Sequence, residues 1–442
     1  MDFRDLLITP LFVPLIYGIA AVLRRRMTDE VTQRYYFPAL TVKIIGALAL
    51  GAIYQFYYHG GDTYNFHTHG SRHIWDAFME NPSAGLEMMF SDGQHKGSFF
   101  KYSSRIYFFQ DKSSYFIIRT AAIFDLLTFS TYSSTALFFA LISFVGMWLL
   151  FLVFYRRYPH LHKQIAVVCF FIPSVFFWGS GLLKDTIMMG CLGGATYSLD
   201  ALVIQRRFSI GKVILLLLCL FVVFSVKKFI LQAFLPCALL WVYLSYVNKI
   251  QSRAARVIIL PFVLALIGVS GYYSVLKVGE GDVRYSVDKI AFTARETALD
   301  IALYTGRDAG STYTLGELDG TMSGMLRLAP VAINVSLFRP YVWEVRNPLM
   351  LLSALESLAM LILTVVIVVR KKAKLLSTLS KPDIIFCLSF SIIYAFAVGV
   401  STFNFGTLAR YKIPLLPFFG LVLVLSFYEN RDNTTEELDA TE

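Results

Sequence analysis

Charged residues are scarce in this chain of 442 residues, of which 16% are charged and 56% are hydrophobic. Soluble globular domains contain about 25% charged and roughly 45–50% apolar residues. The shortage of charge, with a mean hydropathy of +0.60, excludes an ordinary soluble domain. It indicates an all-α, polytopic integral membrane protein.

Cysteine is also scarce, and no C-x-x-C pair occurs. A disulfide framework is therefore excluded as the basis of the fold, and we expect buried free thiols. The five cysteines all lie inside apolar runs: Cys169, Cys191, Cys219, Cys237 and Cys387.

Several catalytic signatures are missing. The sequence has no G-x-x-x-x-G-K-[ST], no H-E-x-x-H and no G-x-S-x-G, which excludes a P-loop ATPase, a zincin and a hydrolase with a nucleophile elbow. Internal repeats of 20–50 residues and low-complexity tracts are absent too. The formal charge of +10 sits in loops beside apolar runs, so it does not point to nucleic acid.

Long apolar runs are abundant. A span needs about 20 mostly apolar residues, and eleven segments qualify within one transmembrane domain over 1–428. The expected spans are 6–23, 38–58, 134–155, 164–183, 186–204, 212–226, 228–247, 256–276, 349–369, 383–402 and 412–428. The polar, acidic tail 429–442 is expected to be disordered.

Basic clusters recur at every second short loop, beginning with Arg24-Arg25-Arg26 and Arg156-Arg157. Because cytoplasmic loops carry an excess of Lys and Arg, these clusters predict an N-terminus outside and a cytoplasmic C-terminus. Two long segments, about 59–133 and 277–348, are then extracytoplasmic loops. Apolar residues at helical spacing predict interfacial helices over 71–79 and 114–129, and the apolar run 321–337 predicts a helix that either lies on the membrane or is re-entrant.

Asp62 follows a span and two glycines, in the sequence Gly60-Gly61-Asp62-Thr63-Tyr64. The glycines permit a tight turn, and the turn would place the carboxylate at the membrane–water boundary. There Asp62 is a candidate general base or metal ligand, or an N-cap of a following helix. The polar neighbours Tyr64, Asn65 and His67 favour function.

With this acidic position at the start of a long outer loop, the chain resembles the integral membrane glycosyltransferases of the GT-C type over roughly 38–428. The resemblance implies a polyprenyl-phosphate-linked sugar donor, a lipid or glycan acceptor, catalysis outside the cytoplasm with Asp62 as base, and a bacterial inner-membrane location. This chain has one acidic residue where many members have two adjacent ones, and an extra span precedes it.

Basic residues at the predicted outer span ends run against the topological rule. A lipid-linked phosphate explains them, since Arg and Lys bind phosphate oxygens; snorkelling to the headgroups of membrane lipids is the alternative. The candidate phosphate-binding residues are Lys184, Lys227, Arg339, Arg410 and Lys412, with Lys228 beside Lys227, and Tyr64 and His67 join them as substrate-binding candidates.

Histidines cluster after Asp62 as His67, His69 and His73. On a helix, His69 and His73 share a face, so a divalent metal such as zinc or manganese is a possible cofactor. Hydrogen bonding to lipid phosphates or sugar hydroxyls is the competing interpretation.

Two other functions stay open. A polysaccharide polymerase or ligase acting on lipid-diphosphate-linked glycans would use the same face, with Arg410 more important than Asp62. A lipid or glycan transporter would need charges near the middle of the spans, where the sequence offers few: Asp200 near a cytoplasmic end and Glu356 about two turns into its span.

Overall fold

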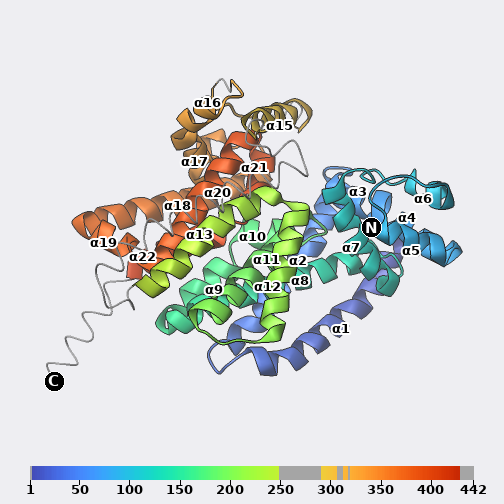
Figure 1. Ribbon diagram of the computed structural model, residues 1–442, viewed down its shortest axis with the longest axis horizontal. Helices are drawn as coiled ribbons and strands as arrows, with labels where there is room; N and C mark the ends of the chain where they lie inside the picture. Colours follow the sequence, from blue (N-terminus) through green and yellow to red (C-terminus); the bar gives the residue numbers. More distant parts are fainter. Residues whose placement is uncertain (1, 248–289, 306–311, 317–318, 429–442) are drawn as a thin grey trace. The chain divides into compact units, whose positions relative to one another are not determined.

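The computed structural model describes residues 2–247, 290–305, 312–316 and 319–428 (Figure 1). These ranges contain helices, turns and one isolated bridge between Thr312 and Asn404, and no strand. With its long apolar helices, the chain is an all-helical membrane protein, as the composition predicts.

Two compact units make up the chain. The first unit comprises 1–200 and 208–227, and the second comprises 201–207 and 228–442. The main helices of the first unit are α1 (Phe3–Met27), α2 (Gln33–Phe56), α3 (Asp62–Phe66), η1 (His67–Ser71), α4 (Arg72–Glu80), α5 (Pro82–Phe90), α6 (Phe100–Ser103), α7 (Lys112–Thr128), α8 (Tyr132–Arg157), α9 (His162–Phe170), α10 (Pro173–Trp178), α11 (Lys184–Leu199) and α12 (Ile210–Val226). Those of the second are α13 (Lys228–Val247), α15 (Ile290–Thr305), α16 (Met322–Arg327), α17 (Ala329–Phe338), α18 (Pro348–Lys371), α19 (Leu375–Leu379), α20 (Pro382–Ser401), α21 (Phe405–Tyr411) and α22 (Leu416–Tyr428).

Seven helices of the described residues are long and apolar enough to cross a membrane, against the eleven spans expected. They are Phe3–Met27, Gln33–Phe56, Tyr132–Arg157, Lys184–Ile204, Lys228–Val247, Pro348–Lys371 and Pro382–Ser401. The pair α21 and α22, bent by 69°, makes an eighth if it counts as one span. The expected span 256–276 lies outside the described residues.

The expected span 164–183 is wrong as a continuous helix. Helix α9 ends at Phe170, α10 runs only from Pro173 to Trp178, and the chain from Gly179 to Leu183 is not helical. Proline lacks the N–H that would continue α9. The expected span 212–226 is the 17-residue helix α12, which is short for a bilayer.

Lys43, near the middle of α2, donates hydrogen bonds at the C-terminal end of α10. Its Nζ donates to Ser143 Oγ at 2.9 Å, to the Gly179 carbonyl at 2.8 Å and to the Val175 carbonyl at 3.2 Å. These three acceptors match the three donors of an ammonium group. Because carbonyls at a helix C-terminus lack intrahelical partners, fully buried Lys43 caps α10 inside the first unit.

Helix α8 is the centre of the first unit and packs on α1, α2 and α11. The backbones of α8 and α11 approach closely at three glycines: a Cβ on Gly146 would lie 2.0 Å from the Gly190 carbonyl oxygen, and one on Gly193 would lie 1.9 Å from the Gly146 carbonyl oxygen. Small residues allow such close helix packing in membranes.

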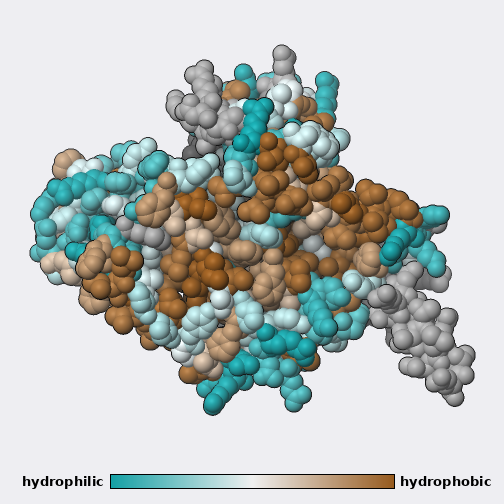
Figure 2. All heavy atoms as spheres, turned by 180° about the vertical axis from the view of Figure 1, so that it is seen from behind, coloured by the Kyte–Doolittle hydropathy of each residue, from teal (hydrophilic) through white to brown (hydrophobic). Residues whose placement is uncertain are grey.

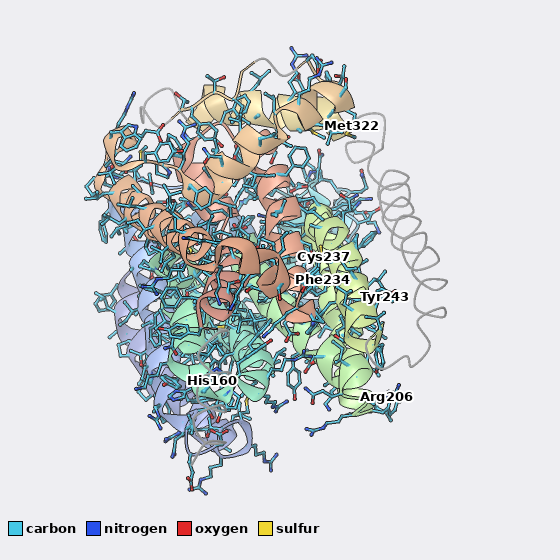
Figure 3. The ribbon with its side chains drawn as sticks, turned by 90° about the vertical axis from the view of Figure 1, so that its left-hand side faces the viewer. His160, Arg206, Phe234, Cys237, Tyr243 and Met322 are labelled. Carbon is cyan, nitrogen blue, oxygen red and sulfur yellow. The ribbon has the colours of Figure 1, made fainter. Side chains whose placement is uncertain are left out.

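The second unit packs α20 against α13, α17 and α22. Phe234 and Cys237, labelled on α13 in Figure 3, are buried, and the Phe234 ring meets Phe386 and Phe390 of α20 edge-on at 6.0 Å. Trp241 Nε1 donates to Asp383 Oδ1 at 2.8 Å within this buried layer.

Apolar side chains also cover much of the surface, in broad patches visible in Figure 2. Helix α1 exposes Leu6, Leu11 and Val22 to more than two-thirds of their areas. Large exposed apolar areas are unusual on soluble monomers, and here they suit contact with lipid.

The segment 59–133 is folded into helices. The expected helix over 71–79 is α4, and that over 114–129 is α7, begun by Asp111, which accepts from the Ser114 N–H at 3.0 Å. The expected helix over 321–337 is present as α16 and α17. The helices predicted at these positions are therefore present, apart from the break between α16 and α17, and their interfacial position stays a prediction.

Candidate functional site

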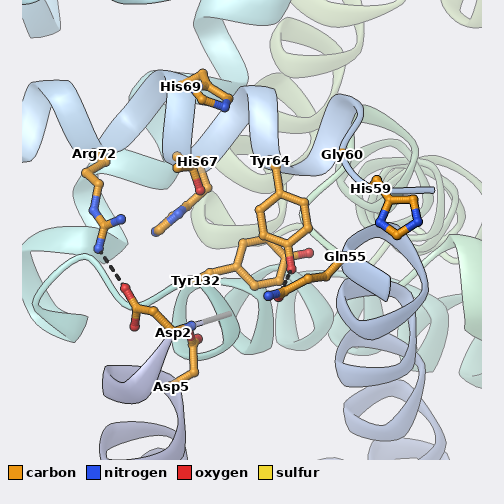
Figure 4. Close-up of a pocket in the computed structure, with 11 residues that line it drawn as sticks. Asp2, Asp5, Gln55, His59, Gly60, Tyr64, His67, His69, Arg72 and Tyr132 are labelled. Atoms are coloured by element: carbon orange, nitrogen blue, oxygen red, sulfur yellow. Dashed lines mark hydrogen bonds and ion pairs between the residues drawn. The ribbon is translucent and has the colours of Figure 1, made fainter. Parts of the chain in front are cut away.

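A cavity of about 400 Å³ lies in the first unit, where α1 and α8 begin and α2 ends (Figure 4). This volume is within the range of small-molecule sites. The residues that line it are Asp2, Asp5, Gln55, His59, Gly60, Tyr64, His67, Thr68, His69, Arg72 and Tyr132.

Two glycines turn the chain from α2 into α3 beside the cavity. Gly60 and Gly61 have φ values of 139° and 120°, which L side chains rarely adopt. A Cβ on Gly61 would also lie 2.8 Å from the Tyr54 ring. The glycine turn predicted from the sequence is therefore present, and α3 begins directly after it at Asp62.

Two carboxylates at the start of α1 line the cavity. Asp5 is buried and accepts from the Ser133 N–H at 2.7 Å and from the Asp2 N–H at 2.6 Å. Asp2 pairs with Arg72 at 3.1 Å. Partial burial opposes ionisation, but Arg72 and the Arg4 N–H lower the pKa of Asp2 below its ordinary value.

Two tyrosine rings form one wall. Tyr64 stacks on Tyr132 with centroids 4.5 Å apart, and its hydroxyl contacts Gln55 Oε1 at 3.0 Å. Burial and the nearby Asp5 carboxylate raise the pKa of Tyr64. The Tyr132 hydroxyl bonds to Thr63 Oγ1 at 2.7 Å. Tyr64 is thus a neutral ring that offers aromatic surface.

His67 points from η1 into the space between Arg72 and Tyr132 (Figure 4). It is only 1% exposed, and its Nε2 lies 3.4 Å from Oδ1 of Asp125, which is 0% exposed. The same Asp125 oxygen accepts from Thr135 Oγ1 at 2.6 Å. Within the described residues, both His67 nitrogens and Asp125 Oδ2 have no hydrogen-bond partner. Buried polar groups are usually satisfied, and this pair is one of several exceptions among the described residues.

Asp62 is the first residue of α3 and is half-buried, but it is not among the residues lining the cavity. Residues two apart on a helix point in different directions, so Asp62 and Tyr64 do not share a face. Of the site residues predicted from the sequence, Tyr64, His67 and His69 line the cavity, and Asp62 does not.

The three predicted metal ligands do not form a metal site. His67 faces Asp125, His73 Nδ1 lies 3.5 Å from Asp76, and exposed His69 lines the cavity. Burial lowers the pKa of His73, with Asp76 acting in the opposite direction. Over the described part of the chain, no group of three or more His, Cys, Asp or Glu side chains is arranged to hold a metal.

The predicted phosphate-binding cations of the first unit both have carboxylate partners. Lys184 Nζ lies 3.3 Å from Asp111 Oδ2 and donates to Ser113 at 2.7 Å. Burial opposes ionisation of Asp111, yet Lys184 and the hydrogen bonds bring its pKa to about 2. Lys227 forms a buried ion pair with Asp185.

In the second unit Arg339 forms a salt bridge to Glu344 and lies 5.1 Å from the centroid of the Phe405 ring. Lys412 is buried and donates to Ser357 Oγ at 2.8 Å. The Arg410 guanidinium lies 5.8 Å from the Tyr411 centroid. The predicted cations thus divide between the two units.

Sequence reasoning missed four residues of the site region: Asp5, Arg72, Asp125 and Tyr132. One signal was available, because Asp125 is the single acidic residue in the apolar sequence of α7. Its partner His67 comes from another segment, and only the fold brings the two together.

Comparisons with protein-family models, with curated proteins and with solved structures give no match.

Proposed function

We propose that the chain is a membrane glycosyltransferase that moves a sugar from a polyprenyl-phosphate-linked donor to a lipid or glycan acceptor, in the cavity of the first unit. The bacterial inner membrane is its proposed location, and cell-envelope glycan synthesis its proposed setting. The resemblance to GT-C enzymes supports this reaction.

The position of the cavity is the observation that carries the proposal. It lies at the first turns of α1 and α8, and the last turns of these helices hold Arg24–Arg26 and Arg156–Arg157. Since basic ends favour the cytoplasm, the cavity would open on the outer side. A lipid carrier in the adjacent bilayer could then present its sugar there.

The lining suits a sugar. Carboxylates, a glutamine and a guanidinium offer hydrogen-bond acceptors and donors to hydroxyl groups, and the stacked Tyr64 ring offers an apolar face. Asp62 as base and a metal held by histidines have no support in the lining of the cavity, so neither is part of this proposal.

The structure adds charges that bear on the transporter alternative. Lys43 lies near the middle of α2, a charge that the sequence prediction of few mid-span charges overlooked. Asp185 and Lys227 are buried at helix ends. Each has internal partners that join helices of the first unit. These contacts favour a structural role for the charges, and the single-sided cavity favours an enzyme.

A variant that fills the cavity tests the site. Purified protein is given labelled polyprenyl-phosphate sugars and an acceptor extract, and wild type is compared with Thr68→Trp and the near-isosteric Thr68→Val. We expect transfer by wild type and Thr68→Val, and a loss of at least about tenfold in Thr68→Trp. Equal transfer by a folded Thr68→Trp protein would place the reaction elsewhere.

A further inference from the structure

The His67–Asp125 pair combines full burial with a position on the cavity. A histidine in a protein core ordinarily hydrogen-bonds through at least one ring nitrogen, yet neither nitrogen of His67 has such a partner among the described residues. Its Nε2 faces Asp125 at 3.4 Å. The remaining nitrogen, Nδ1, is buried without a hydrogen-bond partner among the described residues, on a side chain that lines the cavity.

From this geometry we infer that His67 is the proton acceptor of the reaction and Asp125 its positioning residue. The inference rests on the proposed function. The acceptor hydroxyl attacks the anomeric carbon, a C–O bond forms, and the bond from that carbon to the phosphate oxygen breaks. The hydroxyl proton passes to His67 Nδ1, and polyprenyl phosphate leaves with the bonding electron pair.

Asp125 fixes the imidazole for this task. Its carboxylate favours the tautomer with the proton on Nε2, which leaves the lone pair on Nδ1. It also stabilises the imidazolium that forms after proton transfer. Thr135 Oγ1 donates to the Asp125 oxygen that faces His67, at 2.6 Å, and Thr128 bonds to Thr135 at 2.8 Å, so the carboxylate has a fixed orientation.

The length of the His67–Asp125 contact fits a resting site. A distance of 3.4 Å exceeds an ordinary hydrogen bond, and catalytic hydrogen bonds are often long before substrate binds. A ligand hydroxyl that hydrogen-bonds to Nδ1 would satisfy one orphaned nitrogen, and closure onto Asp125 would satisfy the other.

Five variants of the full chain test the inference: His67→Gln, His67→Ala, Asp125→Asn, Asp62→Asn and the control His160→Gln. His160 is exposed near the end of α8 that lies opposite the cavity. Steady-state transfer is measured for each, with thermal unfolding as the check on folding. His67→Asn replaces His67→Gln if the latter does not fold.

We expect His67→Gln to lower kcat by about 10²–10⁴, the usual contribution of a general base, with KM changed less than about threefold. Asp125→Asn should lower kcat at least about tenfold with the same small change in KM, whereas a purely structural role would alter folding or KM. Free imidazole should restore part of the activity of His67→Ala. His160→Gln should match wild type.

Near-normal kcat in folded His67→Gln would overturn the inference and leave the proposed function standing. Loss of transfer in Asp62→Asn with activity kept in His67→Gln would also overturn it, in favour of the carboxylate predicted from sequence. If wild type transfers no sugar from any donor, the proposed function fails and this role for His67 fails with it.

Discussion

Single residues near the ends of the helices are held by specific charge partners. Asp111 is the clearest case, because it caps α7 and also binds Lys184 at the start of α11. One carboxylate therefore links a helix of the segment 59–133 to a candidate span. Replacing it by asparagine keeps a capping side chain but takes this counter-ion from the partly buried Lys184 ammonium group.

Asp111→Asn should lower the thermal unfolding temperature at pH 7. The pKa of Asp111 is lowered to about 2, so its ionised form stabilises the fold above the unfolded-state pKa of about 3.9, and this stabilisation is lost as the pH falls toward 2. The difference between wild type and variant should thus narrow between about pH 4 and pH 2. A difference that is constant across this range, or one shared by the exposed control Glu30→Gln, would contradict the role of the ion pair.

At the scale of helices, two features hold the first unit together: the cap that Lys43 gives to α10 and the glycine contact between α8 and α11. Both lie inside apolar segments, where an unpaired polar group or a gap between helices has no water to compensate it. Each feature gives a separate prediction.

Lys43→Met should destabilise the protein, because it leaves the Val175 and Gly179 carbonyls and the Ser143 hydroxyl without this donor. An unsatisfied buried polar group costs about 1–3 kcal/mol. Chemical or thermal unfolding in detergent should show the loss, and Lys163→Met, at an exposed position of α9, should not. Unchanged stability of Lys43→Met would show that α10 needs no cap.

Gly146→Ala should separate α8 from α11, because the added Cβ would lie 2.0 Å from backbone of α11. Gly18→Ala is the matched control, since a Cβ at Gly18 on α1 meets nothing within 4 Å. Alanine there should be neutral or stabilise by up to about 1 kcal/mol. Comparing the unfolding temperatures of the two variants checks the contact, and equal values would argue against it.

Local patterns predicted helices well and their interruptions poorly. The spacing in 71–79 and 114–129 is a property of neighbouring residues, so α4 and α7 could be foreseen. Averaged hydropathy over 164–183 hides Pro173 and the irregular chain around Gly179–Gly181, so the break was missed. His67 and Asp125 could be named separately, but their contact is tertiary and no spacing encodes it.

At the scale of the whole molecule, the proposed orientation places the cavity and the segment 59–133 outside the cytoplasm. Gln94→Cys, in that segment, should react with a membrane-impermeant maleimide in intact cells, and His160→Cys only after permeabilisation. All five native cysteines are buried, so background labelling should be low. The reverse pattern would place the cavity in the cytoplasm and contradict the proposed donor side.

The central claim is that the protein transfers a sugar from a polyprenyl-phosphate donor, and the most direct test counts both products. Purified wild-type protein in vesicles is given doubly labelled donor and acceptor, and the glycosylated acceptor and the free polyprenyl phosphate are measured together. Transfer predicts one polyprenyl phosphate released for each sugar gained by the acceptor. Movement of intact donor across the vesicle membrane with neither product formed would contradict the account and identify a transporter.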